Sequence, residues 1–340
     1  MKVTIKDVAE RANVSIATVS RVFNKSGSVT DETRHRVLTI ARDLRYTPNA
    51  SARSLSTSKT DTVGLLLPDL YGEFFSEVIR GADQTVQQHH HHLLVSSSHN
   101  NRSEIEAALR VMRGRVDGLV IMSPHIDAAT LNANLPKSLP VVLLNCYVRD
   151  SSFDSLNIDN FGGANQMVKH LIQHHHARIA IIKGTEQNYD AEERLSGYRT
   201  AVREANLETS PDLEFSGDFT EEAGFEAAKK ILHLQNRPTA IFASNDSMAI
   251  GAISALRESG VHVPEEMAVA GFDDIPISRF MKPGLSSVHV PISNLGVLAM
   301  EHLFAAVTEK DNYIKKQDII TTELVVRESC GIHETNNNDD

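Results

Sequence analysis

The chain of 340 residues is too long for one ordinary core, and at roughly 100–200 residues per domain it predicts two or three cores. Hydrophobic residues make up 41% of it and charged residues 23%, which is typical of a globular protein and excludes a disordered one. No apolar run approaches the roughly 18 residues that span a bilayer, and the first residues lack an apolar secretory core, so we expect a cytoplasmic protein. Two cysteines, Cys146 and Cys330, exclude a disulfide framework and a Cys-rich zinc site.

Charge is divided unevenly along the chain. Residues 1–60 hold 11 Lys and Arg against 5 Asp and Glu, whereas residues 61–340 hold 23 against 39. The net charge of −10 therefore hides a small cationic head on an anionic body. A basic head suits a polyanion such as nucleic acid, although a merely solvated basic face would give the same count. The acidic body should repel DNA and confine any contact to the head.

The first 24 residues predict two short helices joined by a tight turn. Thr4 and Asp7 form a start that resembles a capping box, and apolar residues follow at helical spacing. Asn13 tolerates the left-handed conformation that a tight turn needs. Ser15 can cap a second helix from Ile16 to about Asn24. This arrangement is the helix-turn-helix geometry.

A third helix and a tether are predicted next. The helix starts at Thr30, and its apolar stripe closes the small core of a domain over residues 1–47. Pro48 ends this pattern. Residues 49–55 can form one or two helical turns, but so short a helix is unstable alone and should form only against a partner helix or DNA. Residues 48–60 are therefore expected to be a hinge helix with a flexible linker.

After residue 60, apolar strands alternate with helical stretches, which predicts parallel sheets covered on both faces. Two series of strands look like a weak internal repeat, hence two doubly wound lobes. We expect the N-lobe at about 61–160 plus 291–320 and the C-lobe at about 161–290 plus 321–330. Ligands in such folds bind beyond the carboxyl ends of the strands, which would face one cleft. The first series is 62–69, 93–97, 118–122 and 141–145; the second is 155–159, 178–183, 240–243 and 267–272.

Polar and aromatic residues follow several of these strand ends. Carboxylate, amide and guanidinium groups beside aromatic rings suit a polyol, because the polar groups bond its hydroxyls and a ring packs on its apolar face. Any single Asp or Asn at such a junction is as often a helix cap, but their joint placement favours a ligand site. The candidates are Asp69, Phe74, Phe75, Asn145, Asp159, Arg194, Asn245 and Asp273.

The head resembles the lactose/galactose repressor (LacI/GalR) family of bacterial transcription factors. The resemblance rests on Thr4–Ala9, Val14–Val22 and Tyr46–Asn49, and on Ala52–Leu55, which is similar to the hinge helix of the family. It implies an all-α helix-turn-helix head that reads the major groove and a hinge helix that enters the minor groove. The operator-contacting residues that it implies are Thr4, Ser15, Ile16, Ala17, Thr18, Ser20, Arg21, Asn24, Asn49, Ala52, Arg53 and Leu55.

The body resembles the effector-binding core of the same family, which is itself similar to periplasmic sugar-binding proteins. The resemblance reaches to about residue 329 and adds Phe219 to the effector-binding candidates above. Asn145 and Cys146 depart from the Asp-Trp pair of the purine-responsive branch, which argues against a purine effector. The motifs around Arg194 and Asp273 look closer to the sugar-responsive branches.

Two histidine runs, His89–His92 and His174–His176, fall where a helix should give way to a strand, where family members often have Gly. Neighbouring histidines rarely converge on one ion, so we expect no metal site, and no cofactor is implied. Adventitious affinity for nickel or zinc is the alternative. The chain has no P-loop, dinucleotide-binding, zinc-protease or nucleophile-elbow motif, which argues against an enzyme.

The sequence therefore predicts a homodimeric repressor that binds a near-palindromic operator and responds to a sugar-like effector between its lobes. The tail, residues 331–340, should be disordered, and because it lacks apolar heptads we expect a dimer rather than a tetramer. Two alternatives remain. One is a catabolite-control-type regulator whose effector is a phosphorylated partner protein, and the other is a sugar receptor without a DNA function.

Overall fold

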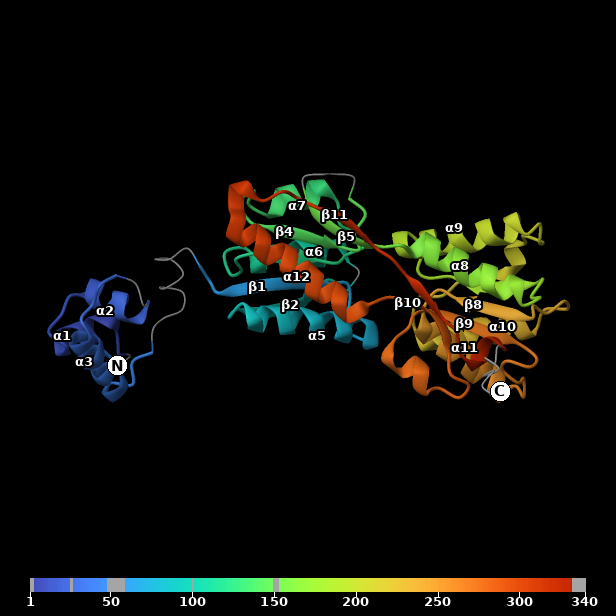
Figure 1. Cartoon of the computed structure of the whole chain (residues 1–340), viewed down its shortest axis with the longest axis horizontal. Helices are drawn as coiled ribbons and strands as arrows, with labels where there is room; N and C mark the ends of the chain where they lie inside the picture. Colours follow the sequence, from blue (N-terminus) through green and yellow to red (C-terminus); the bar gives the residue numbers. More distant parts are fainter. Residues whose placement is uncertain (1–2, 25–26, 48–58, 100, 149–152, 332–340) are drawn as a thin grey trace, which may run out of the picture. The chain divides into compact units, whose positions relative to one another are not determined.

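The structure is a computed structural model that describes residues 3–24, 27–47, 59–99, 101–148 and 153–331. It divides into two compact units. The first, the head, holds the residues up to 61 together with 115–117; the second, the body, holds 62–114 and the rest of the chain (Figure 1). Of the expected disordered tail, residues 331–340, only Gly331 is described; residues 332–340 lie outside the described residues.

The head contains the three predicted helices, α1 (Ile5–Arg11), α2 (Ile16–Phe23) and α3 (Asp31–Asp43). At the start of α1 the Thr4 backbone N–H donates to the Asp7 carboxylate at 2.7 Å, as the capping box predicts. Asn13, between α1 and α2, has a φ of 50°, which confirms the left-handed turn. One apolar cluster joins the three helices; its buried members are Val8, Ala9, Ala12, Val19, Val22, Val37 and Ala41.

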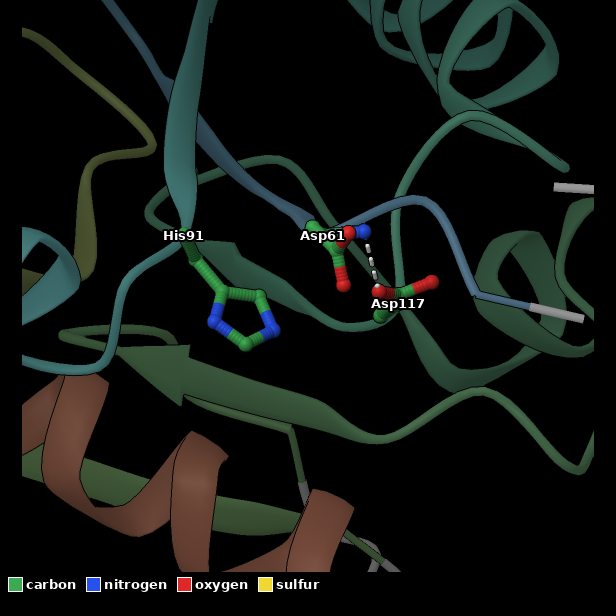
Figure 2. Close-up of side chains that lie close together, drawn as sticks. All are labelled: Asp61, His91 and Asp117. Carbon is green, nitrogen blue, oxygen red and sulfur yellow. Dashed lines mark hydrogen bonds between the residues drawn. The ribbon is translucent and has the colours of Figure 1, made fainter. Parts of the chain in front are cut away.

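The predicted hinge helix, residues 49–55, lies outside the described residues, and so do its operator candidates Asn49, Ala52, Arg53 and Leu55. Of the hinge and linker segment 48–60, only residues 59 and 60 are described. The last residues of the head are anchored by one carboxylate. Asp117 accepts the N–H of Thr60 at 2.8 Å. It also accepts the N–H of Asp61 at 2.9 Å (Figure 2). The Thr60 hydroxyl donates to the same carboxylate at 2.9 Å. These bonds hold Thr60 and Asp61 to the segment 115–117 within the same unit.

The first sheet of the body has the strand order β11-β5-β4-β3-β1-β2, and all its pairings are parallel. The expectation that residues 155–159 open the second series is wrong, because this strand pairs with residues 142–144. The strands are β1 (Thr62–Leu67), β2 (His92–Ser97), β3 (Leu119–Ile121), β4 (Val141–Leu144), β5 (Asp154–Ile158) and β11 (Gln317–Ile320).

The second sheet has the order β12-β10-β9-β8-β6-β7. Its pairings are parallel except for the edge pair β10 and β12, which is antiparallel. The chain passes between the two sheets three times, after β5, after β10 and after β11, which ties the lobes together. The strands are β6 (Ile179–Ile182), β7 (Glu214–Phe215), β8 (Ala240–Ala243), β9 (Ala268–Asp273), β10 (Ser286–His289) and β12 (Glu323–Val325).

Helices cover both sheets. In the first lobe α5 (Glu73–Gln88) packs against α12 (Ile292–Glu309), and α6 (Arg102–Met112) contacts α7 (Ala128–Asn134). The second lobe has α8 and α9 on one face of its sheet and α10 and α11 on the other (Figure 1). Among the described helices, none is long and apolar enough to cross a membrane. The bounds of the second set are α8 (Asn160–Gln173), α9 (Tyr189–Glu204), α10 (Glu221–Leu232) and α11 (Asp246–Glu258).

Both histidine runs lie where a helix gives way to a strand. His89 ends α5 and His174 ends α8, and the next residue of each run takes a left-handed φ, 57° at His90 and 69° at His175. His91, also drawn in Figure 2, directs its Nδ1 to the carbonyl oxygen of His89 at 2.7 Å. The runs thus occupy helix C-terminal turns, in which glycine is the favoured residue at positive φ.

Replacing His175 with glycine should stabilise the protein. A left-handed backbone conformation costs an ordinary residue roughly 1–2 kcal/mol. Glycine avoids this steric cost, but the gain is partly offset because glycine loses more backbone entropy on folding. We expect His175→Gly to raise the free energy of urea unfolding by about 0.5–1 kcal/mol. His174→Gly is the matched control, because His174 has a φ of −95° and gains no relief. Equal effects of the two substitutions would contradict this account.

Candidate DNA-binding and effector sites

The second helix of the head presents a polar face with one apolar residue. The Ser15 side chain caps α2 by accepting the N–H of Thr18 at 3.1 Å. Val19 and Val22 are buried in the core, and the face of the helix that carries Ile16, Ala17 and Arg21 is exposed. Ile16 is 44% exposed at the first turn, so part of its aliphatic side chain is accessible to another molecule. Ser15, Ile16, Ala17 and Arg21 are exposed, and Thr18, Ser20 and Asn24 are half-buried.

The charge of this helix is positive and uncompensated. Residues 15–24 contain no acidic residue, and Arg21 makes no ion pair within the part of the chain that the structure describes. No carboxylate of the described residues therefore neutralises its guanidinium, which can donate to another molecule. Short side chains around one arginine form a surface that can approach a base-pair edge closely. A cation without an acidic partner is what contact with a phosphate or a guanine requires.

A cavity of about 200 Å³ lies between the lobes of the body. Eight of the nine effector candidates line it; Asp159 does not. The Asp159 carboxylate instead accepts the N–H of Gly162 at 2.8 Å and caps α8, which is the alternative role that strand-to-helix junctions offer. The lining candidates are Asp69, Phe74, Phe75, Asn145, Arg194, Phe219, Asn245 and Asp273.

Three of these residues hold strained backbone. Asn145, Phe219 and Asp273 have φ values of 51°, 73° and 101°. Such conformations cost non-glycine residues of order 1–3 kcal/mol and cluster at functional sites, where the surrounding structure enforces them. Phe219 also depends on a glycine, because a Cβ on Gly184 would lie 2.2 Å from the end of its ring. The cavity is thus shaped at a cost to the fold.

Arg194 is the buried cation of the cavity. Its Nε donates to Asn160 Oδ1 at 2.8 Å, and its Nη2 lies 3.2 Å from Asp273 Oδ1. A second donor reaches the carbonyl oxygen of Ser244, and the guanidinium lies 3.8 Å above the centre of the Phe272 ring. These contacts fix the orientation of the guanidinium and leave part of its donor set for a ligand.

Asp190, one turn before Arg194, was not among the sequence candidates. Its carboxylate accepts hydrogen bonds from Asn145, across the cavity in the other lobe, and from Asn160 at 2.9 Å. Burial raises the pKa of both Asp190 and Asp273 to about 6, against the opposing attraction of Arg194. One guanidinium therefore faces two carboxyl groups, and the cavity accepts hydrogen bonds more readily than anions.

Asn245 and Asp69 are less available to a ligand. Asn245 Oδ1 accepts the N–H of Met248 at 3.0 Å and its Nδ2 donates to the Phe219 carbonyl at 2.9 Å. Asp69 accepts the N–H groups of two following residues at 2.6 and 3.1 Å. The cavity is also lined by polar and sulfur-bearing residues that were not among the sequence candidates, because only their position after a strand could have pointed to them. They include Met122, His125, Thr185, Asn188, Asp218, Thr220 and Ser247.

A third buried carboxyl stands behind the cavity wall. Asp246 accepts hydrogen bonds from Ser278 Oγ at 2.6 Å, Ser287 Oγ at 2.5 Å and the N–H of Ile275 at 2.9 Å. Burial, helped by the like charge of Asp273, raises the pKa of Asp246 to about 8 despite these bonds. It thus ties the start of α11 to β10 and to the short helix η2 (Pro276–Phe280).

These raised pKa values predict that the protein loses stability as the pH rises. Below about pH 4 these three carboxyls are protonated in both the folded and the unfolded protein. Above that pH the unfolded chain releases its protons, whereas the folded protein keeps them up to about pH 6 at Asp190 and Asp273 and up to about pH 8 at Asp246. Between pH 6 and 8 the free energy of urea unfolding should fall by roughly 1.4 kcal/mol per pH unit for Asp246 alone. Asp246→Asn should flatten this part of the profile; an unchanged slope would contradict the assignment.

The chain is similar to known repressors over nearly its whole length. Residues 4–49 match the family of bacterial regulatory proteins named lacI, and residues 168–330 match a periplasmic binding protein-like domain. The transcriptional repressor PurR of Histophilus somni (strain 129Pt) is 37% identical over 96% of this chain and 98% of that protein. The probable repressor ExuR of Bacillus subtilis (strain 168) is 33% identical over 96% of this chain and 98% of that protein.

Solved structures agree. The lac repressor dimer bound to operator and the anti-inducer ONPF has a TM-score of 0.85 at 27% identity and covers 97% of this chain and 99% of that one. The complex of the transcriptional regulator CelR with cellobiose has a TM-score of 0.72 at 30% identity and covers 96% and 100%. The helix-turn-helix head, the two-lobed α/β body and the absence of an enzymatic role are thereby confirmed. The chain belongs to the LacI family and is a DNA-binding transcriptional repressor with a small-molecule effector domain.

Proposed function

We propose that the effector is a small uncharged sugar or sugar derivative held in the cavity between the lobes. The observation that carries this is the pairing of Arg194 with the Asp190 and Asp273 carboxyls beside Phe74 and Phe219. Hydroxyl groups both donate and accept, so a polyol can satisfy carboxyls and guanidinium together, whereas an anion would face two carboxylates. The cavity of about 200 Å³ suits a molecule the size of a monosaccharide. CelR, a similar protein, was solved with cellobiose.

The same proposal assigns α2 to the major groove of the operator. Arg21 is placed to read a guanine or to bind a phosphate, and Ile16 and Ala17 to pack on thymine methyl groups. Ser15, Thr18, Ser20 and Asn24, with Thr4 at the start of α1, supply short polar groups for the backbone. A homodimer then requires a near-palindromic operator, and contact with chromosomal DNA places the protein in the cytoplasm.

Effector binding would act through contacts that join the lobes. Besides the bond between Asn145 and Asp190, the Tyr147 and Tyr189 rings stack at 4.1 Å, and the N–H of Ile277 donates to Glu73 at 2.9 Å. A ligand that binds one arrangement of the lobes better shifts the population toward it. A coupling free energy of 1–3 kcal/mol between the effector site and the DNA-binding site, which is typical of allosteric proteins, would change operator affinity roughly 5- to 150-fold.

Two measurements test the proposal. Gel-shift assays with DNA from the protein's own promoter region should show specific binding that weakens steeply with salt. Titration calorimetry against neutral monosaccharides, sugar phosphates and a purine base should show binding of a neutral sugar, with a change in operator affinity. Binding of the purine alone, or a response only to a phosphorylated partner protein, would overturn the sugar assignment while leaving the DNA function intact.

A further inference from the structure

The body has a second cavity, of about 600 Å³, next to the effector cavity. Ile275 lines both cavities, and the adjacent Asp273 and Asp274 line one each. Its walls come from both lobes, with Glu77 and Arg80 of α5 and the first turn of α12 facing η2 and the end of β10. A ligand here would therefore touch both lobes without entering the effector cavity.

Basic groups outnumber acidic ones in this cavity. The Arg80 guanidinium is neutralised by Glu77, with Nε 3.1 Å from Oε1. Arg327 Nη2 at 2.8 Å and His289 Nδ1 at 2.9 Å share the single carboxylate of Asp274. Arg279 has no carboxylate within ion-pair distance among the described residues and stacks on the neighbouring Phe280 ring. The cavity keeps a positive surplus in a body that is acidic overall.

Uncharged donors add to this surplus. Ser293 and Asn294, in the first turn of α12, line the cavity with hydroxyl and amide groups. Their backbone N–H groups have no hydrogen-bond partner in the described part of the chain. A tetrahedral oxyanion with several acceptor oxygens can use a guanidinium, an imidazole and neutral donors at once. We propose that this second cavity binds a small phosphate monoester as a co-effector.

Such a ligand would bias the effector site through the shared wall. Arg279, Arg327 and His289 all belong to the segments that carry Asp273 to Ile275 or pair with them. Drawing these groups toward an anion would fix the arrangement of the lobes and with it the geometry of Arg194 and Asp273. This regulatory consequence rests on the proposed effector cavity, whereas anion binding itself does not. We expect effector affinity to change roughly 5- to 150-fold when the phosphate site is filled.

The binding test uses the full chain without any effector. Inorganic phosphate or glycerol 3-phosphate, against potassium chloride of equal ionic strength, should raise the thermal midpoint by roughly 2–4 °C and broaden the ³¹P resonance of the probe. A stronger response to glycerol 3-phosphate than to inorganic phosphate would show that the site prefers a phosphate monoester. Equal responses would show that the site recognises phosphate alone and would overturn the assignment to a monoester.

Two variants locate the site. Asn294→Asp adds a negative charge that favours the start of α12, so it should fold normally and yet lose the phosphate response. Arg279→Gln, on an exposed side chain, should weaken the response at least fivefold in apparent Kd. Arg257→Gln, an exposed arginine on α11 outside the cavity, is the matched control and should respond as the parent protein does.

Equal phosphate stabilisation of the parent and Asn294→Asp would overturn the site. Phosphate binding that leaves the affinity of an identified effector unchanged would overturn the co-effector role. If the effector proves not to be a sugar, the phosphate response measured without it still decides the site on its own.

Discussion

Replacing Arg194 with methionine should shift the response to effector to roughly 10- to 150-fold higher effector concentration while operator affinity stays within about threefold of the parent protein. Arg194 contacts Asn160, Asp273 and the Ser244 carbonyl, all within the body, and no described contact reaches the head. Loss of charged hydrogen bonds worth about 1.5–3 kcal/mol corresponds to a roughly 10- to 150-fold weaker effector affinity. Titration calorimetry measures the affinity for the effector. Gel shifts without effector measure operator affinity and so check that DNA binding by the head is unaltered.

The same substitution should also lower stability. Removing the cation leaves the buried carboxyls of Asp190 and Asp273 without a cationic partner, which typically costs 3–5 kcal/mol. Because burial already raises the pKa of both groups to about 6, protonation near pH 5 should recover part of that loss. Arg203→Met, on an exposed arginine of the same helix, is the matched control and should change neither quantity. A normal effector response in Arg194→Met would remove Arg194 from the site.

Periodicity was sufficient to predict the architecture because the long elements are strongly patterned. Continuous apolar runs such as Thr62–Leu67 and Ala240–Ala243 are buried on both faces of a parallel sheet, which is what such runs require. The edge strands β7, β11 and β12 escaped prediction, since they have 2–4 residues and exposed or half-exposed side chains that carry little pattern. The sheet to which β5 belongs also could not be predicted, because partner choice is a long-range property.

The effector cavity was predicted in part, for a similar reason. Strand ends mark where a side chain emerges, so Asn145 and Asp273 could be found from position alone. Whether such a residue caps a helix or faces the cavity depends on local geometry, and Asp159 caps α8 instead. Asp190 carried no signal of its own, because its role comes from Asn145, 45 residues away in the other lobe.

The DNA-reading role of α2 leads to the second large effect, at Arg21. Its guanidinium has no ion-pair partner within the described head, so its removal should cost the fold little and operator binding much. We expect Arg21→Ala to weaken specific operator binding by roughly 1–3 kcal/mol, or about 5- to 150-fold, and to relax the preference at one base pair. Gel shifts on operators changed one position at a time measure both effects.

A lysine at the same position separates the two roles that Arg21 can have. If Arg21 reads a guanine with its two-pronged donor set, Arg21→Lys restores the charge and not the fork, so specificity stays lost. A phosphate contact would instead be largely restored by lysine, and Arg21→Ala would lower the slope of log affinity against log salt by about one. Arg42→Ala, which removes an exposed charge of α3, controls for the charge of the head as a whole. Operator affinity that is equal in Arg21→Ala, Arg42→Ala and the parent protein would show that α2 is not the reading helix.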